Sequence, residues 1–382
     1  MPNMIDYIDW RGDLTIGQDP FNEVDNLILS EFCFLDLEGI VPAAETGELV
    51  PLRAAVEAYF RRHQGQELRM GVLVPDEILT MAARMAESPR FASMGLGGFC
   101  SHIDSHREAQ FAALTVDIGD GGIYLAFRGT DDTLVGWKED FNMAFLSTVP
   151  SQPMAVAYVK AAAAAHPGKK LVIGGHSKGG NLAVYSAVHC GGRLRRRIRA
   201  VYNNDGPGFK ESLVETEAYQ TLRERIHTIV PRSSIVGMLL EHDDNYDVVA
   251  SCEKGIYQHD GFSWEVLGSR FVRLRDISSA GRTSDRTIRD FIGAMDDTQR
   301  ERFVDALFEV LGSTNARTLT DLSSDRMGAV TAMIRRYKDF DKETRQTLLE
   351  AVGVLLKVSA GDWVEDLEER GQELKKLLNV KK

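Results

Sequence analysis

The chain has 382 residues, a formal net charge of −11 and 43% hydrophobic residues, a composition typical of a folded globular protein. The acidic balance argues against a nucleic-acid-binding protein, because neutralising phosphates requires an excess of Lys and Arg on one face. The four cysteines form no C-x-x-C pair, so a disulfide scaffold is not expected. The N-terminus has neither a basic nor an apolar leader segment, and no apolar run reaches the roughly 20 residues of a membrane span. We therefore expect a cytoplasmic protein without stable membrane insertion and without a nucleic-acid partner.

The first 65 residues are expected to form a helical arm. Apolar residues recur there at helical spacing, and the same spacing continues in one segment beyond the arm. The helices are predicted over residues 22–29, 52–62 and 78–86.

From residue 111 onward, short apolar runs alternate with segments of helical spacing. This alternation indicates an α/β fold, with a mostly parallel sheet covered by helices on both faces. Strands are predicted over 111–117, 123–127, 170–174, 199–203 and 225–230, and helices over 154–165, 181–188 and 211–223.

Only helical spacing remains after about residue 275. We therefore expect two domains, with residues 1–275 forming the α/β domain and residues 276–382 forming an all-helical C-terminal appendage. The small residues 278–281 are the best candidate for the boundary. The appendage could shield the α/β domain or join copies of the chain into a homo-oligomer.

The strongest chemical signal lies at Ser177. A predicted buried strand over 170–174 runs into the sequence G-H-S-K-G, and a predicted helix follows at once. This strand, turn and helix context makes G-x-S-x-G informative, since the sharp turn needs small neighbours such as Gly175 and Gly179. A serine at a helix N-terminus is also surrounded by N–H groups that stabilise negative charge. The pattern predicts Ser177 as a catalytic nucleophile; a phosphate-binding loop is disfavoured because G-x-x-x-x-G-K-S/T is absent.

A serine nucleophile needs a general base, and a histidine C-terminal to it is expected. His189 lies on the helix after the serine and His227 near the start of a strand, so both are interpreted as structural. His259, ahead of an aromatic segment that resembles a strand, is the preferred base. His242, in an acidic loop, remains the alternative.

The reaction also needs an oxyanion hole built from two backbone N–H groups. One is expected from Lys178, directly after the nucleophile. The other is expected from Gly129 or Thr130, which follow the predicted strand over 123–127.

Several of these segments resemble class 3 (fungal-type) lipases. Residues 127–130 read F-R-G-T and are followed by W-K-E-D at 137–140, similar to the F-R-G-T…W-x-x-D segment of that family. The G-H-S-x-G-G core around Ser177 and the histidine segment at 257–259 are similar too. The resemblance covers roughly residues 95–270.

The segments at 6–13 and 204–209 are more similar to a bacterial family of uncharacterised lipase-like hydrolases, the Mbeg-like proteins. The resemblance implies an α/β-hydrolase fold and a Ser–His–acid triad that works without a cofactor or metal. It implies no particular substrate.

The acid of the triad departs from the lipase pattern. The resemblance places it just after the strand over 225–230, where this chain has Ser233 and Ser234. A serine cannot stabilise an imidazolium as a carboxylate does. Asp205, at the end of the neighbouring strand, is preferred because a rigid strand end positions a carboxylate well. The acidic loop residues Asp243, Asp244 and Asp247 are the alternatives.

Together these features predict a serine esterase or lipase that cleaves small-molecule or lipid esters through an acyl-enzyme. The missing acid at Ser233 and Ser234 leaves open a non-catalytic binding protein of the same fold. An acyltransferase would use the same triad and is a further alternative.

Overall fold

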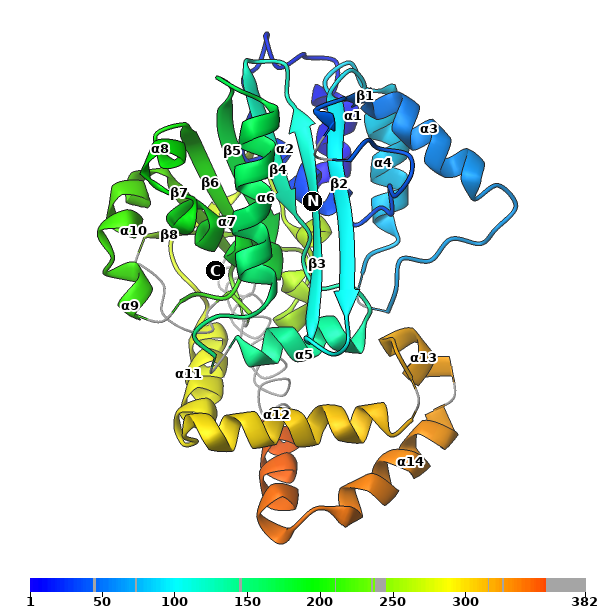
Figure 1. The fold of residues 1–382 in the computed structure, drawn as a ribbon, viewed down its shortest axis with the longest axis vertical. Helices are drawn as coiled ribbons and strands as arrows, with labels where there is room; N and C mark the ends of the chain where they lie inside the picture. Colours follow the sequence, from blue (N-terminus) through cyan, green and yellow to red (C-terminus); the bar gives the residue numbers. More distant parts are fainter. Residues whose placement is uncertain are drawn as a thin grey trace, which may run out of the picture.

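The computed structural model describes residues 1–354 except 44–45, 73, 144–145, 210, 235, 238–244, 315 and 325. A mixed nine-stranded sheet forms its centre, in the order β1-β2-β3-β4-β5-β6-β7-β8-β11 (Figure 1). The ladders between β4 and β8 are all parallel, which confirms the predicted α/β architecture with a parallel core. These strands are β4 (Gly122–Phe127), β5 (Lys170–His176), β6 (Ile198–Asn204), β7 (Ile226–Pro231) and β8 (Tyr246–Val249).

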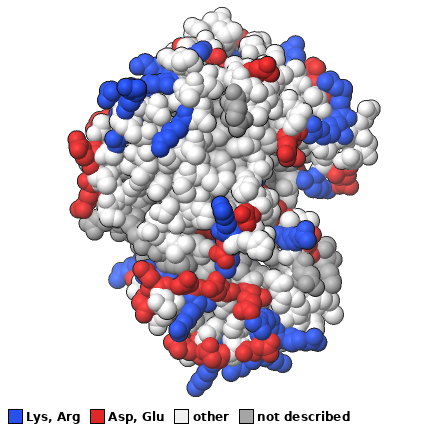
Figure 2. Space-filling model, viewed as in Figure 1, with Lys and Arg blue, Asp and Glu red and all other residues white. Residues whose placement is uncertain are grey.

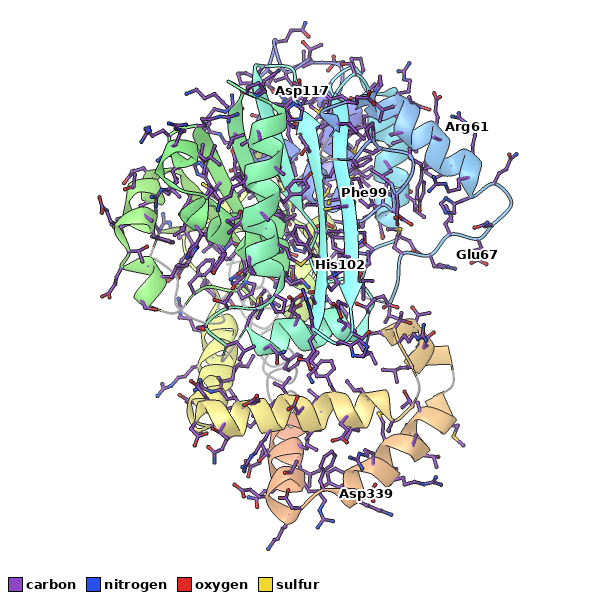
Figure 3. The ribbon with its side chains drawn as sticks, in the orientation of Figure 1. Arg61, Glu67, Phe99, His102, Asp117 and Asp339 are labelled. Carbon is purple, nitrogen blue, oxygen red and sulfur yellow. The ribbon has the colours of Figure 1, made fainter. Side chains whose placement is uncertain are left out.

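Antiparallel strands extend the sheet at both edges. Among the strands longer than two residues, the sequence patterns do not predict β2 and β8. In β2 the pairing register shifts between Gly97 and Cys100, and Gly98 has a φ of 65°, so the alternation of buried and exposed residues is broken. Figure 3 shows Phe99 and His102 on this strand. The strands of these antiparallel extensions are β1 (Val50–Pro51), β2 (Gly95–Asp104), β3 (Ala109–Asp117) and β11 (Arg273–Leu274), with β1 and β11 at the edges.

One face of the sheet is covered by the N-terminal helices. In α2, Leu27, Ile28 and Leu29 are all fully buried, because this helix lies between the sheet and the helices around it. The helix begins at a capping box, in which Asn22 and Asp25 satisfy each other's backbone N–H groups. The segment predicted as an arm is thus a layer of the core. The helices on this face are α1 (Met4–Arg11), α2 (Glu23–Phe32), α3 (Leu52–Arg62) and, beyond the predicted arm, α4 (Glu77–Glu87).

The opposite face is covered by α6 (Ser151–Ala165) and α7 (Lys178–His189), which lie in front of the sheet in Figure 1. The side chains of β4 alternate between the two faces, as a strand buried on both sides requires. Its residues Ile123, Leu125 and Phe127 pack with α6 and α7, whereas Tyr124 and Ala126 pack with the N-terminal helices.

Two predicted elements after β6 differ from the structure. The helix predicted over 211–223 is broken into α9 (Glu211–Val214) and α10 (Glu217–Leu222), because the Thr216 side chain caps a new helix. The segment after His259, where a strand is expected, begins with a 3-10 turn, η4 (Gly261–Ser263), followed by a single bridge from Trp264 to Ser251. Only the two-residue strand β9 (Val266–Leu267), paired with β10 (Arg270–Phe271), follows it.

The described residues after 278 are mainly helical, as predicted, and lie below the sheet in Figure 1. They meet the rest of the chain at α5 (Leu134–Asn142), where the rings of Phe141 and Phe308 are 5.7 Å apart and Lys138 pairs with Asp305 at 2.7 Å. Figure 2 shows acidic side chains gathered along this region. The helices are α11 (Ser279–Gly293), α12 (Asp297–Gly312), α13 (Leu319–Ser324) and α14 (Arg326–Asp339), followed by helical residues 342–354.

No described helix combines the length and hydropathy of a membrane span.

Candidate active site

Ser177 occupies a sharp turn between β5 and α7. Its φ of 57° is one that non-glycine residues rarely adopt, and its side chain is partly exposed. The glycines on either side are sterically required. A Cβ atom on Gly175 would collide with the backbone of Gly179, and a Cβ on Gly179 would collide with the carbonyl oxygen of Phe127. The predicted strained turn is therefore present, with the serine at the N-terminus of α7.

His259 and Asp205 lie in direct contact. His259 ends the 3-10 helix η3 (Gly255–His259), and its Nδ1 is 2.6 Å from Oδ2 of Asp205, the residue after β6. Asp205 is fully buried and also has a positive φ, of 50°. Burial raises the pKa of Asp205, while the hydrogen bond from His259 acts in the opposite direction. The structure thus brings together the preferred base and the preferred acid.

One of the two serines at the expected acid position contacts Asp205. Ser234 Oγ donates a hydrogen bond to Oδ1 of Asp205. Ser233 Oγ lies 2.8 Å from Oγ of Ser278, the residue that caps α11. Sequence reasoning missed this role, since a serine after a strand carries no signal of its partner. The hydroxyl of Ser234 fixes the second oxygen of a carboxylate that comes from the neighbouring strand.

Of the alternative base and acids, only Asp247 is among the described residues. His242, Asp243 and Asp244 lie outside the described residues. Asp247, on β8, is 55% exposed and pairs with Arg273 at 3.1 Å. Its carboxylate therefore already has a partner at the edge of the sheet.

Backbone contacts place Ser177 beside this pair. Its N–H donates to the carbonyl of Asn204 at 2.9 Å, and Asn204 directly precedes Asp205. The preceding ring, His176, lies 4.7 Å from the ring of His259. Among the described residues no hydrogen bond joins Ser177 Oγ to His259. Such bonds are often long until a substrate completes the site.

The loop after β4 lies on the other side of Ser177. A Cβ atom on Gly129 would be 3.2 Å from Cβ of Ser177 and 2.8 Å from the carbonyl oxygen of His176. Within the described chain, no backbone acceptor takes the N–H of Thr130. The N–H of Lys178 is in the first turn of α7, where no intrahelical acceptor exists. Free N–H groups beside a serine are the requirement for holding an oxyanion.

The side chain of Lys178, on α7, is linked to this loop through Asp140 of α5. Its Nζ is fully buried, 3.1 Å from Oε2 of Glu139 and 3.8 Å from Oδ1 of Asp140. It also donates to Gln110. Asp140 in turn accepts a hydrogen bond from Thr130 Oγ1. Burial raises the pKa of Asp140 to about 6, although the charge of Lys178 opposes this shift. Sequence reasoning used only the backbone of Lys178 and missed its side chain.

Neither a metal-binding cluster nor the surface groove between α3 and α4 belongs to this site among the described residues. No cluster of three His, Cys, Asp or Glu side chains suited to a metal ion occurs within the described ranges. A groove of about 710 Å³ lies between α3 and α4 and includes Arg61, labelled in Figure 3. Its other lining residues are Arg53, Val56, Glu57, Phe60, Gln64, Ala83, Ala86 and Glu87, and none of them touches the groups around Ser177 described above.

Comparison with known proteins identifies the family of this chain. Residues 85–309, more than half of the chain, match the family model described as Mbeg1-like. The chain belongs to the Mbeg1-like family. This confirms the resemblance inferred from residues 6–13 and 204–209. No curated protein matches the sequence of this Mbeg1-like protein.

Solved structures of fungal lipases are similar to this Mbeg1-like chain. The Rhizomucor miehei lipase propeptide complex is 18% identical with a TM-score of 0.31, over 42% of this chain and 58% of the lipase. A fungal lipase–inhibitor complex is 17% identical with a TM-score of 0.28, over 40% of this chain and 65% of that one. The chain thus spans less than two thirds of either lipase.

Proposed function

We propose that this Mbeg1-like protein is a serine hydrolase of the α/β-hydrolase fold that cleaves carboxylic esters. Ser177 is the nucleophile, His259 the general base and Asp205 the acid. The observation that carries the proposal is the 2.6 Å contact of His259 Nδ1 with the buried Asp205, beside a serine held at positive φ.

The chemistry follows from the proton positions. Nδ1–H of His259 donates to the Asp205 carboxylate, so Nε2 of the neutral ring is left to accept the Ser177 proton. Ser177 Oγ then attacks the ester carbonyl. The protonated His259 returns that proton to the departing alcohol as the tetrahedral intermediate collapses. Water, deprotonated by His259, hydrolyses the acyl-enzyme and restores Ser177.

The negative charge of each tetrahedral intermediate is held by backbone groups. The N–H of Lys178 and that of Gly129 or Thr130 serve as donors in this proposal. Their support is the packing of Gly129 against Ser177 and the position of Lys178 in the first turn of α7. Donors of this kind typically contribute about 3–4 kcal/mol each to the barrier reduction.

Within this proposal, residues 1–275 form the hydrolase domain and residues 276–382 a helical appendage. The appendage covers α5, the helix that carries Glu139 and Asp140 beside the oxyanion loop. The contacts of α5 with Asp305 and Phe308 support this arrangement.

Activity-based labelling tests the proposal. Purified protein is expected to react with a fluorophosphonate probe at Ser177 and to hydrolyse short acyl p-nitrophenyl esters. Ser177→Ala is expected to lose both. Ser186→Ala, at a buried serine further along α7, is the matched control and is expected to keep both. Folded wild-type protein that is not labelled, or equal labelling of Ser177→Ala, contradicts the proposal.

A non-catalytic binding protein is the second candidate. It is favoured by one observation, that no hydrogen bond joins Ser177 Oγ to His259 among the described residues. Unlabelled wild-type protein would support it. An acyltransferase uses the same groups and is separated by its product, since transfer yields a new ester where hydrolysis yields a free acid.

A further inference from the structure

Two buried titratable side chains next to the site have no part in the proposed reaction. Glu31, near the end of α2, has a side chain that is 3% exposed, and His176, at the end of β5, one that is 8% exposed. Glu31 Oε1 is 3.0 Å from Nδ1 of His176, and the atom positions give this buried oxygen no other partner and no well-directed hydrogen bond among the described residues. No lysine or arginine pairs with this carboxyl in the part of the chain that the structure describes. A buried carboxyl without a cation needs another means of stabilisation.

The opposite nitrogen of His176 determines where its proton lies. Nε2 is 2.7 Å from the backbone carbonyl oxygen of His259, and a carbonyl oxygen only accepts hydrogen bonds. Nε2 therefore carries a hydrogen and donates it. In a neutral imidazole the other nitrogen, Nδ1, is then an acceptor. A second acceptor, the Glu31 oxygen, lies beside it, and two acceptors this close are stabilised only if one more proton is shared between Nδ1 and Oε1.

That proton can belong to either partner. An imidazolium–carboxylate pair would place two charges in a nearly dry site, whereas a neutral ring beside a carboxylic acid places none. Burial lowers the pKa of His176 well below its usual range. Burial raises the pKa of Glu31 well above its usual range, with a smaller contribution from the charge of Asp260. Both shifts favour the neutral pair.

The neutral pair holds the backbone of the proposed base. The two imidazole rings lie 4.7 Å apart and within 32° of parallel, and Nε2–H of His176 fixes the carbonyl of His259. The residue before His259 is also held, because Trp264 Nε1 donates to the carbonyl of Gln258 at 2.9 Å. Since His176 directly precedes Ser177, one residue connects the backbones of the proposed nucleophile and base.

We propose that Glu31 is a protonated positioning residue that donates to Nδ1 of His176, so that His176 Nε2–H holds the His259 backbone in place for proton transfer. The proposal rests on the assignment of His259 as the base. It makes α2, far from Ser177 in the sequence, part of the support of the site.

The neutral pair and the imidazolium–carboxylate pair predict opposite results for Glu31→Gln. The amide can replace a carboxylic acid that donates a hydrogen bond, but it cannot replace a carboxylate that neutralises an imidazolium. A carboxylic acid and a primary amide both donate a hydrogen bond, so Glu31→Gln is expected to label at Ser177 with a fluorophosphonate within about threefold of the wild-type rate. Glu31→Leu, of similar size but without a donor, is expected to label up to about 100-fold more slowly, as misplacement of a base can do. Circular dichroism and thermal melting of each variant report whether it is folded.

A spectroscopic measurement on the wild-type protein needs no variant and no activity. Long-range proton–nitrogen NMR spectra of ¹⁵N-histidine-labelled protein, assigned by the loss of one signal set in His176→Phe, report the tautomer of His176. A neutral ring protonated at Nε2 is expected near neutral pH. A doubly protonated ring overturns the proposal, and so does equal slowing in Glu31→Gln and Glu31→Leu, or no slowing in a folded Glu31→Leu. Absence of labelling in the wild-type protein instead overturns the proposed function, and the NMR result still reports on the pair.

Discussion

The two sides of Ser177 are supported by buried side chains of different character. On the side of the proposed base, Asp205 contacts His259, His176 contacts the carbonyl of His259, and Glu31 lies 3.0 Å from His176. In the proposed assignment Asp205 is the ionised group of this set. On the oxyanion side, the Lys178 ammonium is buried against Glu139 and Asp140. Burying a charge is costly unless a partner compensates it. The base side should therefore be sensitive to the placement of protons, and the oxyanion side to the balance of charge.

The largest effect is expected from Asp205→Asn. An asparagine amide donates to Nδ1, so His259 is forced into the tautomer with Nε2 protonated and cannot accept the Ser177 proton. The rate of ester hydrolysis should fall roughly 10³- to 10⁴-fold. Denaturant unfolding should show a much smaller change, because Ser234 can still donate to the amide oxygen.

The matched control for this change is Asp247→Asn, which alters an exposed carboxylate of β8 that pairs with Arg273. It should leave the rate nearly unchanged. A loss of less than about tenfold in Asp205→Asn would remove this residue from the proposed triad.

The second-largest effect is expected on the free energy of unfolding. Lys178→Met leaves Glu139 and Asp140 buried without their cation, which should lower the free energy of unfolding by about 3–5 kcal/mol. Urea titration followed by circular dichroism measures it. Lys138→Met serves as the comparison, since Lys138, in the middle of α5, pairs with the more exposed carboxylates of Glu108 and Asp305, 38% and 60% exposed; a loss of about 1 kcal/mol or less is expected there. Equal losses in the two variants would show that burial does not set the cost.

The smallest effect concerns pH. The pKa of Asp140 is raised to about 6 in the folded protein, so between about pH 4 and 6 the folded state holds a proton that the unfolded state has released. The contribution of this group to stability is thus complete below about pH 4 and is lost as the pH rises through about 6. Asp140→Asn should remove this decline. Melting temperatures of wild-type and variant protein from pH 4 to about 7 test it, and parallel curves would contradict the assigned shift.

The parts of the site that the sequence predicts are those encoded locally. G-x-S-x-G after a buried strand predicts the turn at Ser177, and neighbouring strand ends predict that Asp205 reaches the His259 loop. Glu31, the hydroxyl of Ser234 and the side chain of Lys178 could not be found in this way. Their partners come from distant segments, and only the packing of α2 on the sheet, or of α5 beside α7, brings them together.

The same distinction holds for the fold. The strands with regular apolar runs, β4 to β7, were found at nearly their observed bounds. β2 was missed because its glycines and its shifted register remove the alternation that marks a strand. The N-terminal helices were recognised as helices, yet their place in the core depends on which strands they meet.

The position of α2 also matters for how the protein is made. Glu31 precedes His259 by 228 residues, so at typical rates of synthesis the helix leaves the ribosome roughly ten to fifty seconds before the segment it supports. In the first part of that interval, before β4, β5 and β6 have been made, Leu27, Ile28 and Leu29 lack the strands that bury them. The nascent chain therefore exposes an apolar helix before its sheet has formed, and chaperones can bind such a stretch. Reactivity at Ser177 should appear only after the translated chain has passed the histidine.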